Sequence, residues 1–253
     1  MTERNVISDL ASLEKAILLL ESKFSGTPDF WWRGHSLLEW DLVPKVYRSD
    51  RENNEHNYAW TFLQYAPSRY ERCPAEKNYA AWLFLMQHYG VPTRLLDWTK
   101  SALIGLYFAV ADSQLDEKPG ALWGLQPSKL NKTQVSIDGL IPTDDGRVIR
   151  LAEDAFDYKM PKGSKEIIAV PTQQRDVRHL VQESMFTVHG SNQPLNKFEV
   201  SKEYLVCWEI PSSSKSRLRC TLDRMGMNRA NLFPDLENLA RHIDSLSFRK
   251  PDV

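Results

Sequence analysis

The sequence has little cysteine, almost no net charge and no long apolar run. Its three cysteines, Cys73, Cys207 and Cys220, are far apart and lack Cys-x-x-Cys spacing, so we expect free thiols in a reducing cytoplasm. Lys and Arg number 32 against 33 Asp and Glu, and a net charge of -1 provides no global field for nucleic acid or anionic membrane. No run approaches the roughly 20 apolar residues of a membrane span. The charged N-terminal segment is also unlike the apolar core of a signal peptide.

Several common enzyme signatures are also missing. The chain has no Gly-x-x-x-x-Gly-Lys-Ser/Thr, no Gly-x-Gly-x-x-Gly, no His-Glu-x-x-His and no Gly-x-Ser-x-Gly. We therefore expect no P-loop, no Rossmann nucleotide site, no zincin centre and no bound metal. With 253 residues, 42% of them hydrophobic and 26% charged, the chain is typical of a globular protein with a substantial core.

The hydrophobic pattern predicts helices mainly in the first half and strands mainly in the second. The expected helices span 8–25, 58–70, 73–89, 99–112, 148–156, 212–225 and 233–243, with one or two helical turns over 175–183. Ser8 and Thr99 are the expected caps of the helices at 8–25 and 99–112. The expected strands span 30–33, 40–47, 121–125, 166–170, 186–189 and 202–210. Residues 49–57 and 131–147 lack periodicity. This order indicates an α+β fold with a mixed or antiparallel sheet. We expect one domain over residues 1–253, with helix 8–25 as a cover and two C-terminal helices within 212–245.

A short polar stretch, residues 87–99, lies between two apolar segments that are long enough to be buried helices. Its Arg94 and Asp97 are close enough in sequence to pair, and a pair that only fixes the junction is the commoner role. Alternatively, the stretch lines a cleft. In that case Tyr89 could stack on a base or nicotinamide, His88 could bind a ribose hydroxyl, and Thr93 could add a further polar group.

Arg33 follows three aromatic residues and precedes Gly34, where the missing side chain allows a close approach to the backbone. A planar guanidinium makes bidentate bonds to phosphate or diphosphate. The alternative is an arginine that stacks on Trp31 or Trp32 and pairs with a carboxylate. The sequence favours neither reading over the other.

Two of these motifs together carry a family resemblance. Phe30-Trp-Trp-Arg-Gly-His35 and His88-Tyr-Gly-Val-Pro-Thr-Arg-Leu-Leu-Asp-Trp-Thr99, with an Ala-rich helix that ends Tyr107-Phe-Ala109, resemble the FRG-domain family of bacterial and phage proteins. The family is named for an aromatic-Arg-Gly motif. The segment from Gln182 to Thr187 is similar to its later Gln-x-x-x-Phe-Thr segment. The resemblance implies a family more firmly than an activity.

An Arg-Gly pair on an early strand is also similar to the first motif of arginine-type ADP-ribosyltransferases, whose arginine helps to hold the diphosphate of NAD. That similarity implies that Arg33 binds diphosphate. It places Gln182 or Glu183 beside the nicotinamide ribose, where the group would stabilise an oxocarbenium-like transition state. The Glu-x-Glu and Ser-Thr-Ser motifs of those enzymes are absent.

Three functions follow from these candidates. The first is an NAD-using ADP-ribosyltransferase-like toxin or antiphage effector, in which NAD is a substrate contacted by Arg33, His88, Tyr89, Thr93 and Arg94. The second is a non-catalytic module that binds nucleotide, RNA or DNA. The third is a protein-interaction domain. The first two require that Arg33, the 87–99 stretch and the 182–189 segment meet at one positively lined cavity.

Overall fold

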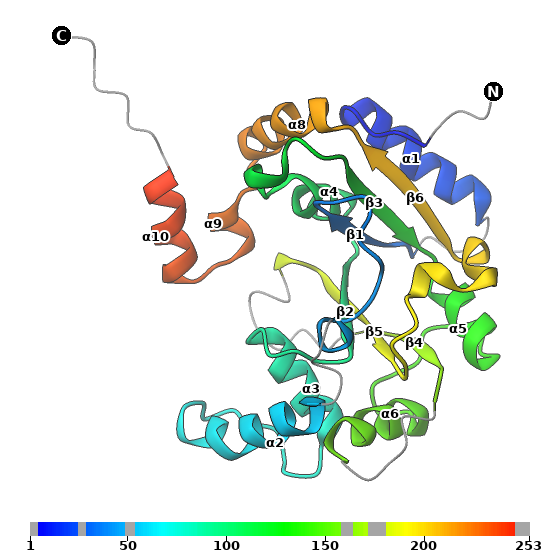
Figure 1. Cartoon of the computed structure of the whole chain (residues 1–253), viewed down its shortest axis with the longest axis vertical. Helices are drawn as coiled ribbons and strands as arrows, with labels where there is room; N and C mark the ends of the chain where they lie inside the picture. The colour runs from blue at the N-terminus through cyan, green and yellow to red at the C-terminus, as the bar shows by residue number, and fades with distance from the viewer. Residues whose placement is uncertain (1–4, 25–28, 49–53, 158–163, 172–180, 246–253) are drawn as a thin grey trace.

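The computed structural model describes residues 5–24, 29–48, 54–157, 164–171 and 181–245. These residues form a six-stranded antiparallel sheet in the order β4-β5-β2-β1-β3-β6, with helices against it (Figure 1). The strands are β1 (Trp31–His35), β2 (Leu95–Thr99), β3 (Gly120–Leu125), β4 (Ile167–Pro171), β5 (Ser184–His189) and β6 (Leu205–Ile210). The predicted α+β class and antiparallel sheet are therefore confirmed.

The helices flank these strands along the whole described chain, and the N-terminal half is rich in them. They are α1 (Leu10–Lys23), α2 (Glu55–Tyr65), α3 (Tyr79–His88), α4 (Ala102–Val110), α5 (Pro127–Val135), α6 (Gly146–Phe156), α8 (Ser212–Arg224), α9 (Arg229–Leu232) and α10 (Leu236–Ser245). In the part of the chain that the structure describes, no helix combines the length and apolar character needed to cross a bilayer.

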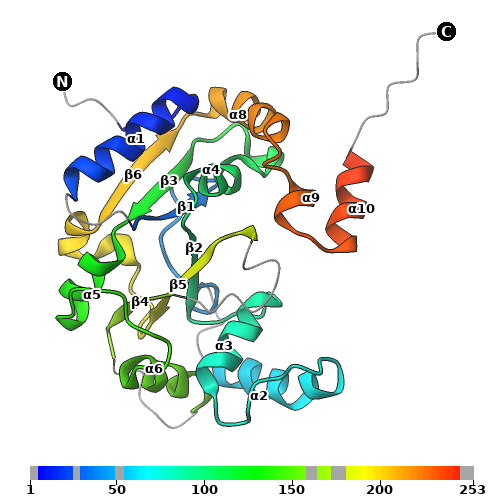
Figure 2. The ribbon, with the colours of Figure 1, turned by 180° about the vertical axis from the view of Figure 1, so that it is seen from behind.

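The sheet consists of two three-stranded halves that touch at one point. β1 and β2 share one register pair, Trp32 with Thr99, whereas β1 and β3 share five and β2 and β5 share five. The half made of β6, β3 and β1 and the half made of β2, β5 and β4 therefore diverge, as the two opposite views show (Figures 1 and 2). Backbone groups beyond the shared pair must find other partners.

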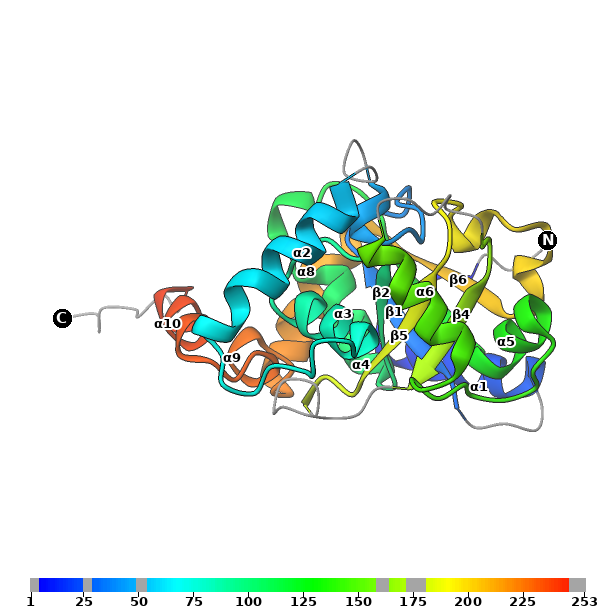
Figure 3. The same cartoon turned by 90° about the horizontal axis from the view of Figure 1, so that it is seen from below.

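Three apolar clusters hold the two halves together. One packs α1, α4 and α8 on β1, β3 and β6, and a second packs α2, α3 and α6 on β2, β4 and β5 (Figure 3). The third lies on the opposite face and joins strands of both halves through Trp31, Leu96, Leu125, Ala169 and Leu205. Successive residues such as Trp31 and Trp32 belong to different clusters because neighbouring side chains in a strand point to opposite faces.

Gly34 is needed for the packing of α4 on β1. A Cβ atom at this position would lie 2.0 Å from the carbonyl oxygen of Gly105 and 2.4 Å from the backbone nitrogen of Ala109. The close approach that the sequence indicated at Gly34 is therefore made by a helix of the same chain.

The segment 40–47 was wrongly predicted as a strand. It bends instead, with a short 3-10 turn at Lys45–Tyr47. The backbone nitrogen of Leu42 donates to the side chain of Asn196 at 2.8 Å, which takes the place of a strand partner. Pro44 has no N–H to donate. This segment consequently forms a wall of the opening between β1 and β2.

The most consequential correction concerns residues 95–99, which were expected only as a helix junction and form the central strand β2. Thr99 therefore ends a strand, and Ser101 caps α4 by accepting from the backbone nitrogen of Ile104 at 3.4 Å. Five residues with Asp97 in the middle are too short and too polar for an unambiguous strand pattern.

The ends of several helices also differ from the predicted ones. Asp9 rather than Ser8 caps α1, and α3 begins at Tyr79, well after the expected start at Cys73. Of the expected loop 49–57, residues 49–53 lie outside the described part and α2 begins at Glu55. The expected irregular stretch 131–147 is partly helical, because α5 extends to Val135 and α6 starts at Gly146.

Candidate functional site

A cavity of about 790 Å³ opens where β1 and β2 diverge. Its walls come from β1, the 36–48 segment, the end of α3, β2, Phe108 of α4, and the start of β5. This volume is in the range of small-molecule and cofactor sites, roughly 300–1,000 Å³. The three segments singled out in the sequence all contribute to it, through Arg33, Asp97 and Gln182 among others.

The guanidinium of Arg33 extends from β1 to β2 at this opening. Its Nη1 donates to the backbone carbonyl of Asp97 at 2.6 Å and lies 3.8 Å from Oδ2 of the same residue. The arginine thus supplies a bond to a strand carbonyl at the place where the ladder between β1 and β2 ends. Of the two readings left open for Arg33, the carboxylate partner is present in the structure.

His35 sets the direction of this guanidinium. Nε of Arg33 donates to Nε2 of His35 at 3.0 Å, and Nδ1 of His35 lies 3.2 Å from the carbonyl oxygen of Trp40. A guanidinium N–H can only donate, so Nε2 accepts and the ring proton is on Nδ1. Burial, with the nearby charge of Arg33, lowers the pKa of His35 to about 3. His35 is therefore neutral at pH 7 with one tautomer fixed.

Arg33 remains charged and partly accessible. Burial is the main cause that lowers its pKa, to about 10, and Asp97 opposes that shift. The side chain is 17% exposed. Its Nη2 has no hydrogen-bond partner among the described residues, whereas Nε and Nη1 are both used. One edge of the guanidinium is thus available to a ligand in the cavity.

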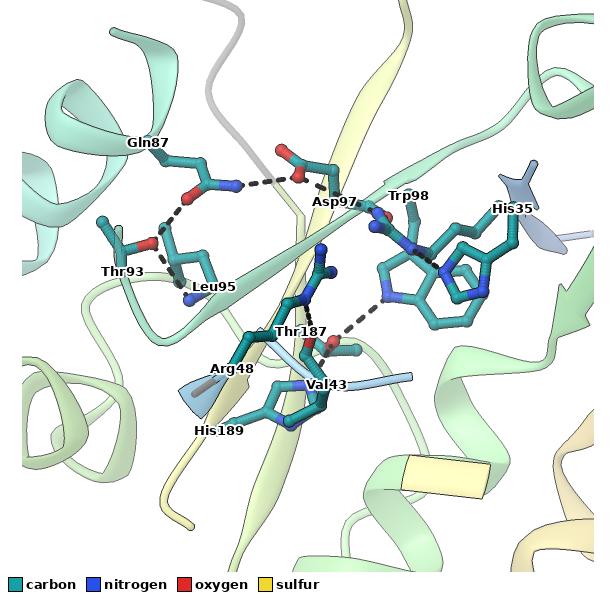
Figure 4. Close-up of polar contacts among 11 residues, drawn as sticks. His35, Val43, Arg48, Gln87, Thr93, Leu95, Asp97, Trp98, Thr187 and His189 are labelled. Atoms are coloured by element: carbon teal, nitrogen blue, oxygen red, sulfur yellow. Dashed lines mark hydrogen bonds and ion pairs between the residues drawn. The ribbon is translucent and has the colours of Figure 1, made fainter. Parts of the chain in front are cut away.

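A short chain of hydrogen bonds fixes the carboxylate of Asp97 (Figure 4). Nε2 of Gln87 donates to Oδ2 of Asp97 at 2.7 Å, and Oγ1 of Thr93 donates to Oε1 of Gln87 at 2.5 Å. The Thr93 oxygen in turn accepts from the backbone nitrogen of Leu95 at 3.1 Å. Each amide atom of Gln87 therefore has a defined partner, and its NH₂ must face the carboxylate.

The predicted pair between Arg94 and Asp97 is wrong. Arg94 is 1% exposed and binds Glu55 with contacts of 2.7 to 3.2 Å, and its Nη1 donates to the carbonyl of Leu151 at 2.9 Å. Residues three apart in an extended chain point to opposite faces, which separates Arg94 from Asp97. Arg94 ties α2 and α6 to the sheet and does not line the cavity.

His88, Tyr89 and Thr93 also lie off the cavity wall. His88 borders a second hollow of about 660 Å³ beside α3, and Tyr89, 55% exposed, packs against the rings of Phe62 and Tyr70. Thr93 is fully buried and reaches the cavity only through Gln87. Their expected contacts with NAD are therefore not direct ones in this arrangement.

The third segment contributes Gln182 but not Glu183. Gln182 lines the cavity, although its Nε2 donates to the carbonyl of Leu232 at 2.9 Å. Glu183 is exposed, has a φ of 46°, and is absent from the cavity wall. The preceding residues 172–180, which include the expected helical turn from Arg175, lie outside the described part of the chain.

His189, on the strand expected at 186–189, is completely buried. Its Nε2 lies 2.9 Å from Oγ1 of Thr187, which accepts from Nε1 of Trp98 at 3.1 Å (Figure 4). Burial, followed by the effect of Arg33, lowers the pKa of His189 to about 3. A second neutral histidine therefore supports the strands beneath the site.

The formal charges on the cavity wall are balanced, contrary to the expected positive lining. The described wall has three cations, Arg33, Lys45 and Arg48, and three carboxylates, Glu39, Asp41 and Asp97. Within the described ranges no cluster of His, Cys, Asp and Glu could hold a metal ion.

Sequence reasoning missed His35 and Gln87 as site residues and treated Asp97 only as a structural partner. Two signals were present. His35 lies two residues after Arg33 and thus on the same face of the strand, and Gln87 and Asp97 are polar residues within apolar surroundings.

Comparison with known proteins gives one match. The FRG domain family model matches residues 28–118. No curated protein and no solved structure matches the chain. The matched range holds every residue of the cavity wall except Gln182 and Ser184. Residues 28–118 therefore match the FRG domain family, and the cavity between β1 and β2 is built mainly from this matched range.

Proposed function

We propose that the cavity binds NAD and that the chain is an ADP-ribosyltransferase-like, NAD-consuming enzyme. The observation that carries this proposal is the position of Arg33, whose Nη2 is unpartnered in the described chain at the wall of a cofactor-sized cavity. A guanidinium held by neighbours on its other nitrogens is preorganised for a phosphate oxygen.

The mixed charge of the wall supports a small ligand over a polynucleotide. NAD has an anionic diphosphate and a cationic nicotinamide ring, so it needs both signs of charge close together. A nucleic acid needs a surplus of cations along its backbone. The wall has equal numbers of formal cations and carboxylates.

Trp40 adds a surface for a ring. Its side chain is 44% exposed at the cavity wall, and its backbone carbonyl is tied to Nδ1 of His35. An indole in that position can stack on adenine or nicotinamide, a contact that suits any base. Consumption of NAD, or ADP-ribosylation of a macromolecule, would fit a toxin or an antiphage effector.

The proposal is tested with the purified chain and NAD labelled in the nicotinamide ring. Incubation, alone and with cell lysate or RNA, should release nicotinamide. Arg33→Lys keeps the charge but loses the planar pair of N–H donors that can bind a phosphate in a bidentate manner. It should raise the Kd for NAD at least ~10-fold. Arg150→Lys, at an exposed pair with Glu166, is the matched control and should bind as the parent does. Intact NAD under all these conditions would reject the enzyme.

A second function, nucleotide binding without turnover, is favoured by the position of Gln182. Its amide, one of the groups expected beside the reacting carbon, is bonded to Leu232. This alternative predicts that NAD, other nucleotides or a short oligonucleotide bind in an Arg33-dependent manner and that NAD stays intact. For an oligonucleotide, the affinity should fall as salt rises.

A further inference from the structure

We infer that Asp97 is the catalytic carboxylate of this cavity and that it stabilises the positive charge on C1′ of the nicotinamide ribose as the glycosidic bond breaks. The inference rests on the proposed NAD-consuming function. It assigns to Asp97 the role for which the sequence had suggested Gln182 or Glu183.

Asp97 presents a half-open carboxylate to the cavity. Its side chain is 55% exposed, Oδ2 accepts from Gln87, and Oδ1 has no hydrogen-bond partner within the described chain. Its neighbour is Arg33, whose Nη1 is 3.8 Å from Oδ2. A group for a diphosphate and a group for a developing cation are therefore side by side, as they must be for a ligand in which one ribose separates these two charges.

The other carboxylates near the cavity pair with lysines and not with Arg33, or lie off the wall. Glu39 lies 3.7 Å from Lys118, and Asp41 lies 3.2 Å from Lys197 and accepts from Asn196 at 2.8 Å. Glu183 is off the wall, and the Gln182 amide carries no charge. Asp97 is thus the wall carboxylate that faces Arg33 in the described structure.

Gln87 and Thr93 act through Asp97 and are positioning residues. The bonds from Thr93 to Gln87 and from Gln87 to Asp97 are 2.5 and 2.7 Å long, and both donor and acceptor of the amide are defined. A carboxylate held in this way needs little reorganisation when charge develops next to it, which is the main source of electrostatic catalysis.

The chemical step balances without a further reagent. The bond between C1′ of the ribose and the ring nitrogen of nicotinamide breaks, its electron pair leaves with neutral nicotinamide, and C1′ becomes an oxocarbenium ion beside Asp97. Water, or a nucleophile on the target molecule, then forms the new bond to C1′ and loses a proton to solvent. No oxidation or reduction occurs.

The test compares Asp97→Asn with the parent chain, measuring nicotinamide release and NAD binding separately. Asparagine keeps the shape and can still accept from Gln87. We expect turnover to fall at least ~100-fold, as for the loss of one preorganised electrostatic contact. The Kd for NAD should rise by less than ~10-fold, because a half-exposed carboxylate holds the cationic ground state only weakly, whereas the positive charge reaches C1′ in the transition state. Asp138→Asn, at an exposed pair with Lys132, is the control for a lost carboxylate and should keep full turnover.

A second variant covers the case in which asparagine disturbs the fold. Asp97→Ala leaves room for a small anion, so added formate should restore part of its turnover, and chloride at equal ionic strength should not. Glu183→Gln should retain activity. Equal turnover of parent and Asp97→Asn, or loss in Glu183→Gln alone, overturns the assignment and leaves the proposed function standing. A parent chain that releases no nicotinamide overturns both.

Discussion

Nε2 of His35 accepts a hydrogen bond from Nε of Arg33 at 3.0 Å, between two residues that are two positions apart on one strand. The same histidine holds the carbonyl of Trp40 at 3.2 Å. One buried neutral ring therefore connects Arg33 to the segment that carries the exposed indole of Trp40. The Arg-Gly-His sequence places both side chains on one face, while Gly34 between them allows α4 to pack on the other.

The first prediction concerns this bond. His35→Phe keeps a flat ring but cannot accept from Arg33, and losing a hydrogen bond to a charged group costs about 1.5 kcal/mol, roughly tenfold in Kd for NAD. His35→Gln can still accept through Oε1 and should retain more of the affinity. Calorimetric titration with NAD measures both. Equal affinities of the two variants would show that the histidine does not orient Arg33.

The second prediction is a dependence of stability on pH. The pKa of His35 and of His189 is about 3 in the folded chain, below the ordinary value near 6.5. The unfolded chain thus binds more protons, and the stabilisation present above pH 6.5 is lost as pH falls toward 3. With two protons involved, the slope of the unfolding free energy should approach about 2.7 kcal/mol per pH unit between pH 6 and 5.

Urea unfolding at closely spaced pH values gives this slope. His189→Gln removes one of the two titrating groups and should roughly halve the slope. A slope that is unchanged in this variant would mean that other groups cause the loss of unfolding free energy at low pH.

The third prediction tests whether Arg94 stabilises the fold and has no part in the cavity. Glu55→Gln leaves the charge of Arg94 buried without its counter-ion, and breaking a buried pair in this way costs about 3–5 kcal/mol. Urea unfolding should show this loss, whereas Asp138→Asn at an exposed pair should change little. If the Glu55→Gln variant keeps its stability but no longer binds NAD, Arg94 contributes to the binding site and the prediction is wrong.

The fourth prediction tests the fit of α4 against β1. Gly34→Ala puts a methyl group 2.0 Å from the carbonyl oxygen of Gly105, so the helix must shift and the protein should lose at least about 2 kcal/mol. Gly139→Ala is the matched control, because no atom lies within 4 Å of the added carbon. Its free energy of unfolding in the same assay should stay within about 0.5 kcal/mol of the parent value. Equal stabilities of the two variants would contradict the observed packing.

Segments with apolar residues at helical spacing, or with a continuous apolar run, were predictable from that pattern. The strands at 121–125, 166–170 and 202–210 and the helices over 148–156 and 212–225 lie within a few residues of their expected bounds. The FRG motifs likewise identified the family from contiguous residues. β2 was missed because the polar Asp97 in the middle of its five residues removes the pattern that distinguishes a strand from a junction.

The sequence by itself determined the class of fold, the match of residues 28–118 to the FRG domain family and the segments from which the site is built, since these depend on local periodicity and on adjacent residues. The pairing of charges was decided by the tertiary structure alone. Arg94 turns to Glu55 and Arg33 turns to Asp97 because side chains on opposite faces of an extended chain cannot meet, and because β1 and β2 part after one shared pair. That divergence depends on how the two halves of the sheet pack on their helices, and sequence spacing alone does not encode it.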